Sequence, residues 1–102
     1  MVEKLIKDGK VAILISPGFG AGWSTWNWEH AEELLFDKEL IEKFINDRPN
    51  FEKFADEKYP DCYLSTGNLC VKWIDQGVQF EINEYDGSEN LHIIGPKTGY
   101  IA

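Results

Sequence analysis

The sequence predicts a single α+β domain over residues 1–102, with a small, mostly antiparallel sheet, an N-terminal hairpin, two to three central helices and C-terminal strands. Three observations support this prediction. An Asp-Gly pair lies between two apolar runs near the N-terminus, amphipathic stretches occupy the middle of the chain, and apolar and polar residues alternate in its last third. Because strands cluster at both ends and helices lie between them, we expect one antiparallel or mixed sheet.

The N-terminal hairpin is centred on Asp8-Gly9, because Asp-Gly between apolar runs is a strong signal for a tight turn. Strands are expected at residues 2–6 and 10–16. The second strand is apolar almost throughout, which indicates a central, buried position. Pro17 ends this strand, and the three glycines among residues 18–22 predict a loop.

Helices are expected in the middle of the chain. The first begins near Asn27 and continues through Leu35, and Asp37 can cap the second, which ends at a break over residues 46–49. The second helix is amphipathic, and its apolar face carries Leu40, Ile41, Phe44 and Ile45. A third, short helix is expected to open at Asn50. Its inward residues are Phe51, Phe54 and Ala55.

The C-terminal third has the pattern of strands separated by turns. Residues 69–74 alternate, Asp75-Gln76-Gly77 turns the chain back, and residues 78–83 follow with a period of two. Val78, Phe80 and Ile82 share one face, and Gln79, Glu81 and Asn83 share the other. Asp86-Gly87 is expected to form a further turn, and residues 91–94 are expected to form the last strand.

Composition argues against several functions. The chain has a net charge of −8 and no cluster of Lys and Arg, which disfavours binding to nucleic acid because phosphates repel such a surface. Its apolar runs reach about five residues, fewer than the roughly 20 that span a membrane, and the N-terminus lacks a secretory signal pattern, so we expect a cytoplasmic protein. Cys62 and Cys70 lie eight apart without a CxxC pair, which favours two free thiols over a zinc site or a disulfide.

The segment Pro17–Trp28 is the main candidate for a functional site. Its GxGxG spacing differs from the GxGxxG of dinucleotide-binding domains, and Trp23 stands where a Walker A loop requires lysine. A glycine loop before a helix can instead hold an anion on its backbone N–H groups, while neighbouring tryptophans stack on a flat ring. The alternative is a packed corner with Trp23 and Trp26 in the core. The predicted ligand-binding residues are Gly18, Phe19, Gly20, Gly22, Trp23, Ser24, Thr25, Trp26, Asn27, Glu84 and Asp86.

The acidic segment Glu84–Glu89 is a second candidate, because its carboxylates could bind Mg²⁺ or transfer protons. An ordinary acidic turn is the alternative. His30 stands in an HxE pattern, but the PCxxC that accompanies it in zinc deaminases is missing. The chain shows no Ser-His-Asp or Cys-His pattern, so we predict no catalytic residue, no metal and no cofactor.

Four stretches together carry a family resemblance: SPGFGAGWSTWN at residues 16–27, LLFD at 34–37, KYPD at 58–61 and VQFEINEYDGSE at 78–89. In these stretches, and along almost its whole length, the chain resembles a group of small proteins widespread in tailed-phage genomes. The group has no settled activity, so the resemblance implies an origin, and with it the cytoplasm of an infected bacterium, but no site residues. Small acidic phage proteins often act by binding: they block host enzymes, mimic DNA or sequester nucleotide signals of host defence.

Two functional hypotheses follow. The first is a non-catalytic phage protein that sequesters a nucleotide-derived defence signal, with a homo-oligomer bringing Lys72 or Lys97 to the phosphates because Arg48 is the only arginine. The second is an acidic inhibitor that binds a host protein, for example at its DNA-binding surface. The second would be favoured by an acidic face made of Glu29, Glu32, Glu33, Glu39 and Glu42. An enzyme acting on a nucleotide is a third hypothesis.

Overall fold

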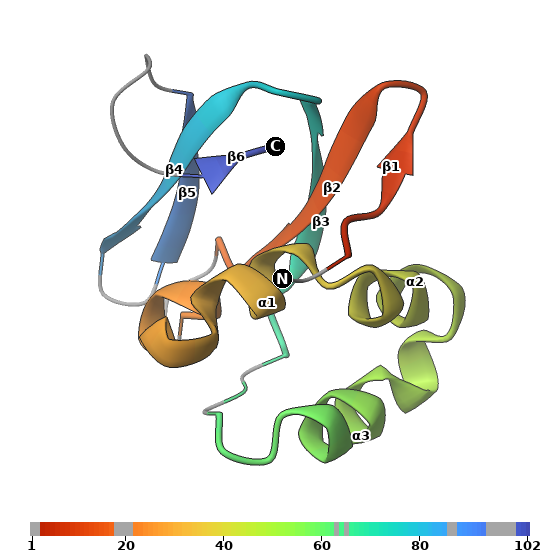
Figure 1. Cartoon of the computed structure of the whole chain (residues 1–102). Coiled ribbons are helices and arrows are strands. Elements are labelled where there is room, and N and C mark those ends of the chain that lie inside the picture. The colour runs from red at the N-terminus through yellow and green to blue at the C-terminus, as the bar shows by residue number, and fades with distance from the viewer. Residues whose placement is uncertain (1–2, 18–21, 63, 65, 86–87, 94–99) are drawn as a thin grey trace.

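Figure 1 shows a computed structural model of the chain, in which residues 3–17, 22–62, 64, 66–85, 88–93 and 100–102 are described. The described residues form two three-stranded antiparallel sheets and a group of helices packed below them in the view of Figure 1. This arrangement confirms the predicted α+β class, with its N-terminal hairpin, central helices and C-terminal strands.

The N-terminal hairpin forms the first sheet together with a strand from the second half of the chain. β1 (Ile6–Lys7) and β2 (Lys10–Ile15) pair antiparallel, and Asp8 and Gly9 have positive φ angles of 54° and 76°, as a tight hairpin turn requires. β3 (Cys70–Asp75) pairs with the other edge of β2. The predicted central position of β2 is therefore confirmed.

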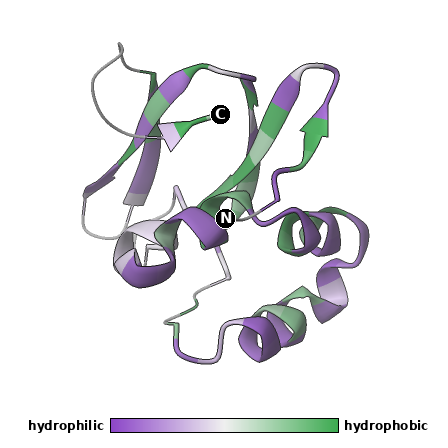
Figure 2. Cartoon of the chain, viewed as in Figure 1, coloured by the Kyte–Doolittle hydropathy of each residue, from purple (hydrophilic) through white to green (hydrophobic). Residues whose placement is uncertain are grey.

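β2 is buried on both faces because a different layer covers each. One face contributes Ala12 and Leu14 to a core cluster shared with the helices, and the other contributes Val11, Ile13 and Ile15 to a cluster shared with the second sheet. Figure 2 shows this strand in the green of apolar residues, while purple covers much of the helices. Burial of each large apolar side chain contributes about 2 kcal/mol, so β2 is a major source of stability.

The second sheet contains β4 (Gln79–Tyr85) between β5 (Ser88–Ile93) and β6 (Tyr100–Ile101). The predicted apolar face of β4 is confirmed, since Phe80 is fully buried and Val78 and Ile82 pack against the same cluster. β5 begins three residues before the predicted start of the last strand, and Ile94 and the turn Asp86-Gly87 lie outside the described residues.

The expectation of one sheet is wrong, and the turn after β3 gives the physical reason. The chain does turn at the predicted place, with Gly77 at φ 89°. The N–H of Gln76, however, donates to the carbonyl of Gly9, and the N–H of Gly77 donates to the carbonyl of Ala102. These bonds tie the turn to the hairpin tip and to the C-terminus, and β4 pairs with β5 and β6 instead of β3.

The helical region starts with two 3-10 turns, Ser24–Trp26 and Trp28–His30. Three α-helices follow: α1 (Ala31–Phe36), α2 (Lys38–Asn46) and α3 (Arg48–Lys58). Within the described residues, no helix combines the length and the apolar character needed to cross a membrane.

Two of the predicted helix starts are wrong and one is confirmed. Asn27 has φ −130° and ψ 59°, which is not helical, so 3-10 turns precede an α-helix that starts four residues later than expected. Asp37 caps α2 as predicted, since its Oδ1 accepts from the N–H of Leu40 at 3.3 Å. α3 begins before Asn50, because Pro49 lies in its first turn, where a missing N–H costs no helical hydrogen bond.

Candidate functional site

The described part of the loop after β2 does hold an anion on its backbone, and that anion is the carboxylate of Glu89. Glu89, on β5, is fully buried. Its Oε1 accepts from the N–H of Ser16 at 2.9 Å, and its Oε2 accepts from the N–H of Trp23 at 2.7 Å and of Thr25 at 3.0 Å. The hydroxyl of Thr25 donates to the same Oε2 at 2.6 Å. The chain thus supplies its own ligand to donors that we predicted for an external one.

The start of β5 is tied to the end of β2 by two further bonds. The N–H of Glu89 donates to the carbonyl of Ser16 at 2.8 Å, and the Ser88 hydroxyl donates to the carbonyl of Pro17 at 2.6 Å. The two conspicuous motifs of the sequence, SPGFGAGWSTWN and EYDGSE, therefore meet in space. Sequence reasoning placed Glu84 and Asp86 in one site with the loop, but it did not identify Glu89 as the residue that binds the loop.

Trp23 is a core residue. Its side chain is fully buried, its indole N–H donates to the carbonyl of Leu34 at 2.8 Å, and its ring lies 6.3 Å from that of Phe51. A ring enclosed in this way cannot stack on a ligand at the surface. Gly22, just before it, is needed for close packing, because a Cβ there would lie 2.6 Å from the Thr25 hydroxyl and 2.7 Å from the Trp26 ring.

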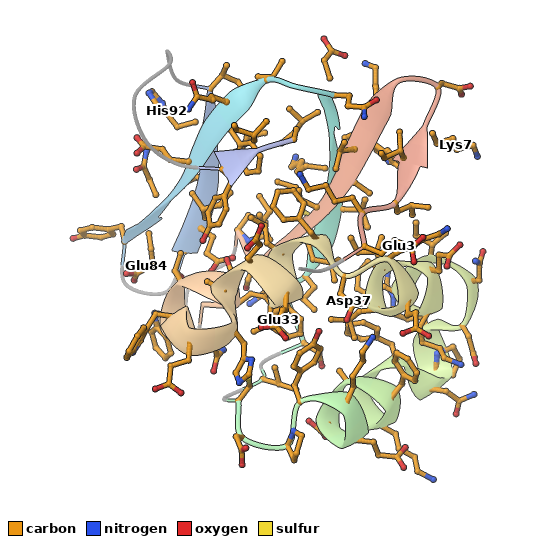
Figure 3. All side chains as sticks on the ribbon, in the orientation of Figure 1. Glu3, Lys7, Glu33, Asp37, Glu84 and His92 are labelled. Atoms are coloured by element: carbon orange, nitrogen blue, oxygen red, sulfur yellow. The ribbon has the colours of Figure 1, made fainter. Side chains whose placement is uncertain are left out.

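The other predicted site residues are distributed around this corner. Ser24 is buried, and its hydroxyl has no hydrogen-bond partner among the described residues. Asn27 donates from Nδ2 to the carbonyl of Trp23 at 2.9 Å. Glu84 is exposed, pairs in register with Glu89, and lies at the outer end of β4, away from α2 (Figure 3). Gly18, Phe19, Gly20 and Asp86 lie outside the described residues.

Trp26 and Trp28, in contrast to Trp23, lie at the surface. Trp26 is 43% exposed and Trp28 is 80% exposed. They border a small hollow of about 170 Å³, which we call the Trp groove. The groove is lined by Trp26, Asn27, Trp28, Glu29, His30, Asp61 and Cys62. The candidate segment Pro17–Trp28 includes Trp28, but the predicted ligand-binding residues do not, although its polar neighbours Asn27 and Glu29 are a signal for exposure.

Carboxylates continue from the Trp groove into a larger cavity of about 360 Å³. His30 connects the two, since its Nδ1 lies 3.1 Å from Oε1 of Glu33, which lines the cavity. Figure 3 labels Glu3, Glu33 and Asp37 in this region. The lining residues are Glu3, Glu32, Glu33, Asp37, Lys38, Glu39, Lys58 and Tyr59. Four of the five residues of the predicted acidic face therefore line the groove or the cavity.

In the larger cavity, the carboxylate of Asp37 is paired with other side chains of the same chain. Asp37 is buried, accepts from the Tyr59 hydroxyl at 2.5 Å and pairs with Nζ of Lys58 at 2.7 Å. Nζ of Lys58 also lies 2.8 Å from Glu39. Burial and the hydrogen bond to Asp37 raise the pKa of Tyr59 far above its ordinary value.

Lys58 also keeps its proton. Burial lowers its pKa, but the hydrogen bonds from its ammonium to Asp37 and Glu39 outweigh burial and hold the pKa above the ordinary value. Neither Tyr59 nor Lys58 can therefore serve as a base or nucleophile near neutral pH. The cluster fits a structural role, which joins α2 to the end of α3.

Among the residues that the structure describes, no group of three or more His, Cys, Asp and Glu side chains is arranged to hold a metal. The two cysteines are free thiols. Comparison of the chain with protein-family models, with curated proteins and with solved structures gives no match. The resemblance to tailed-phage proteins and the predicted ligand-binding residues therefore stay predictions.

Replacement of Glu89 should destabilise the protein strongly. Glu89→Ala leaves the buried N–H groups of Trp23 and Thr25 without their acceptor, which we expect to cost about 3 kcal/mol or more in the free energy of unfolding. Urea denaturation followed by tryptophan fluorescence measures this. Glu52→Ala removes an exposed carboxylate from α3 and is the matched control. Equal stability of the two variants would contradict the role assigned to Glu89.

Gly22→Ala should also destabilise the fold, because the new Cβ would overlap the Thr25 hydroxyl and the Trp26 ring. We expect a loss of about 2 kcal/mol, typical of a forced overlap in a packed region. Gly67→Ala is the matched control, since its Cβ would meet no heavy atom within 4 Å. A Gly22→Ala protein as stable in urea as Gly67→Ala would show that this close packing is unimportant.

Stability should fall in alkaline solution partly because of Tyr59. Its folded pKa is raised, so above pH of about 10 the unfolded chain releases a proton that the folded protein retains, and unfolding becomes more favourable. Tyr59→Phe should cost about 2 kcal/mol at neutral pH and flatten the decline between neutral and alkaline pH. Tyr85→Phe, at an exposed tyrosine, should change neither. Thermal unfolding across this pH range provides the test, and parallel pH curves for all three proteins would refute it.

Proposed function

We propose that this protein acts by binding: it is an acidic phage protein that attaches to a basic surface of a host protein through the Trp groove. Trp28 is the observation that carries the proposal, because its side chain is 80% exposed. Tryptophan is enriched among the residues that dominate the energy of protein interfaces, and an exposed apolar ring rimmed by polar groups is typical of a contact surface.

The charges around Trp28 support a basic partner. Glu29 and Asp61 line the same groove, and further carboxylates line the adjacent cavity. The net charge of the chain is −8, so attraction to a positive surface would act before contact and accelerate association. A host protein that normally binds nucleic acid has such a surface. Salt should weaken the complex, because it screens this attraction.

Sequestration of a nucleotide-derived signal is a second candidate, supported by the exposed rings of Trp26 and Trp28, which can stack on a base. It ranks second for two reasons. The N–H groups of Trp23 and Thr25 already bind Glu89, and the groove is smaller than the roughly 300 Å³ of ordinary small-molecule pockets. Calorimetry with cyclic dinucleotides and ADP-ribose derivatives tests it, and heat that disappears in Trp28→Ala would place this function first.

Trp28→Ala should abolish capture of the partner without affecting the fold. The side chain is largely in water, so we expect a stability change within about 0.5 kcal/mol but at least tenfold weaker binding. Immobilised wild type should retain a basic protein from a bacterial host lysate at low salt and release it at high salt. Mass spectrometry identifies that protein, and calorimetry measures its affinity.

Trp73→Ala is the matched control for this experiment, because Trp73 is 40% exposed but lies on β3 and does not line the groove. It should retain the same basic protein as wild type. Capture that survives both high salt and Trp28→Ala would overturn the proposed function.

A further inference from the structure

The Trp groove has the size of a site for one long side chain. Its volume of about 170 Å³ lies below the range of roughly 300–1,000 Å³ in which drug-sized ligands bind. Two tryptophans, Trp26 and Trp28, and two acidic residues, Glu29 and Asp61, line it. A hollow of this size and composition fits an elongated cationic group better than a nucleotide or a broad apolar surface.

The described residues of the Trp groove do not neutralise its two acidic side chains. In the larger cavity next to it, Lys58 already lies 2.7 Å from Asp37 and 2.8 Å from Glu39. Among the described residues that line the Trp groove, none is Lys or Arg, and His30 is directed at Glu33. Glu29 and Asp61 therefore line a site in which a partner could supply the positive charge.

The Cys62 thiol, which lines the groove, lies in a negative electrostatic environment. Burial raises its pKa, and the negative charges of Glu33, Asp61 and Glu29 raise it further. The same charges that disfavour a thiolate at this place favour a cation there. The field therefore agrees with the geometry of the rings and the carboxylates.

We propose that the Trp groove recognises a single arginine side chain of the partner protein, with the guanidinium stacked on an indole ring and paired with the carboxylates of Asp61 and Glu29. This inference rests on the proposed function and specifies the partner's anchor. Arginine fits better than lysine because its planar, weakly hydrated guanidinium stacks on aromatic faces and pairs with carboxylates through two parallel hydrogen bonds. An ammonium is more strongly hydrated and lacks the flat face.

The test is a titration of the intact protein with two blocked heptapeptides, Gly-Gly-Lys-Arg-Lys-Gly-Gly and its analogue with a central Lys. The two have equal charge and length. NMR follows the four indole N–H signals, one for each tryptophan of the chain. We expect the signals of Trp26 and Trp28 to move and those of Trp23 and Trp73 to stay. The arginine peptide should bind about fivefold more tightly than the lysine peptide.

Asp61→Asn should remove most of this preference for arginine. Asp56→Asn is the matched control, because it removes the same charge from an exposed position on α3 outside the groove. Equal affinity of the two peptides, or movement of the Trp73 signal instead of Trp28, would overturn the arginine anchor.

Failure of the anchor can be told apart from failure of the proposed function. If a basic host protein still requires Trp28 while the two peptides bind equally, the binding function stands and only the arginine anchor is wrong. If the lysate experiment shows no salt-sensitive partner that depends on Trp28, the proposed function fails, whatever the peptides do.

Discussion

The buried carboxylate of Glu89 is the interaction on which the arrangement of this protein depends. It joins three segments that lie far apart in the sequence: the end of β2 at Ser16, the 3-10 turn that contains Thr25, and the start of β5. A fully buried carboxylate is tolerated only when hydrogen-bond donors surround it. Backbone N–H groups are the main donors to Glu89, and Glu89 in turn is their acceptor. Because donors and acceptor satisfy each other, removal of either side leaves the other buried and unsatisfied.

The hydrogen bonds to Glu89 place Trp23 in the core, whereas Trp26 and Trp28 lie at the surface. The N–H of Trp23 is fixed on Glu89, and its indole is fixed on the carbonyl of Leu34, so the ring fills the cluster beneath β2. The 3-10 turns that follow bring Trp26 and Trp28 to the outside. A segment that looked like one aromatic site in the sequence is therefore divided into a structural part at Trp23 and an exposed part at Trp26 and Trp28.

Local chemistry explains how much of this could be predicted from the sequence. The hairpin at Asp8-Gly9, the buried strand β2, the apolar face of β4 and the Asp37 cap each depend on neighbours in the chain, and each prediction is confirmed. The division into two sheets depends on hydrogen bonds from the turn after β3 to Gly9 and Ala102, which no local pattern encodes. The bond between Trp23 and Glu89 spans 66 residues, and a glycine loop has no periodicity that would assign its tryptophans to inside or outside.

The larger cavity and the Trp groove are both lined by acidic residues, but they differ in how those residues are paired. In the larger one, Lys58 and the Tyr59 hydroxyl complete the environment of Asp37, so a cation could bind Asp37 only by displacing this internal ion pair. In the Trp groove, Glu29 and Asp61 are lining residues together with the exposed Trp26 and Trp28, and the described lining includes no lysine or arginine. The backbone donors of Trp23 and Thr25 are occupied by Glu89, and the described lining of the Trp groove includes carboxylates but no lysine or arginine. Both observations disfavour a phosphate ligand and support the proposal of a basic partner. The charged side chains that the fold already pairs internally therefore determine which charge a partner would have to carry.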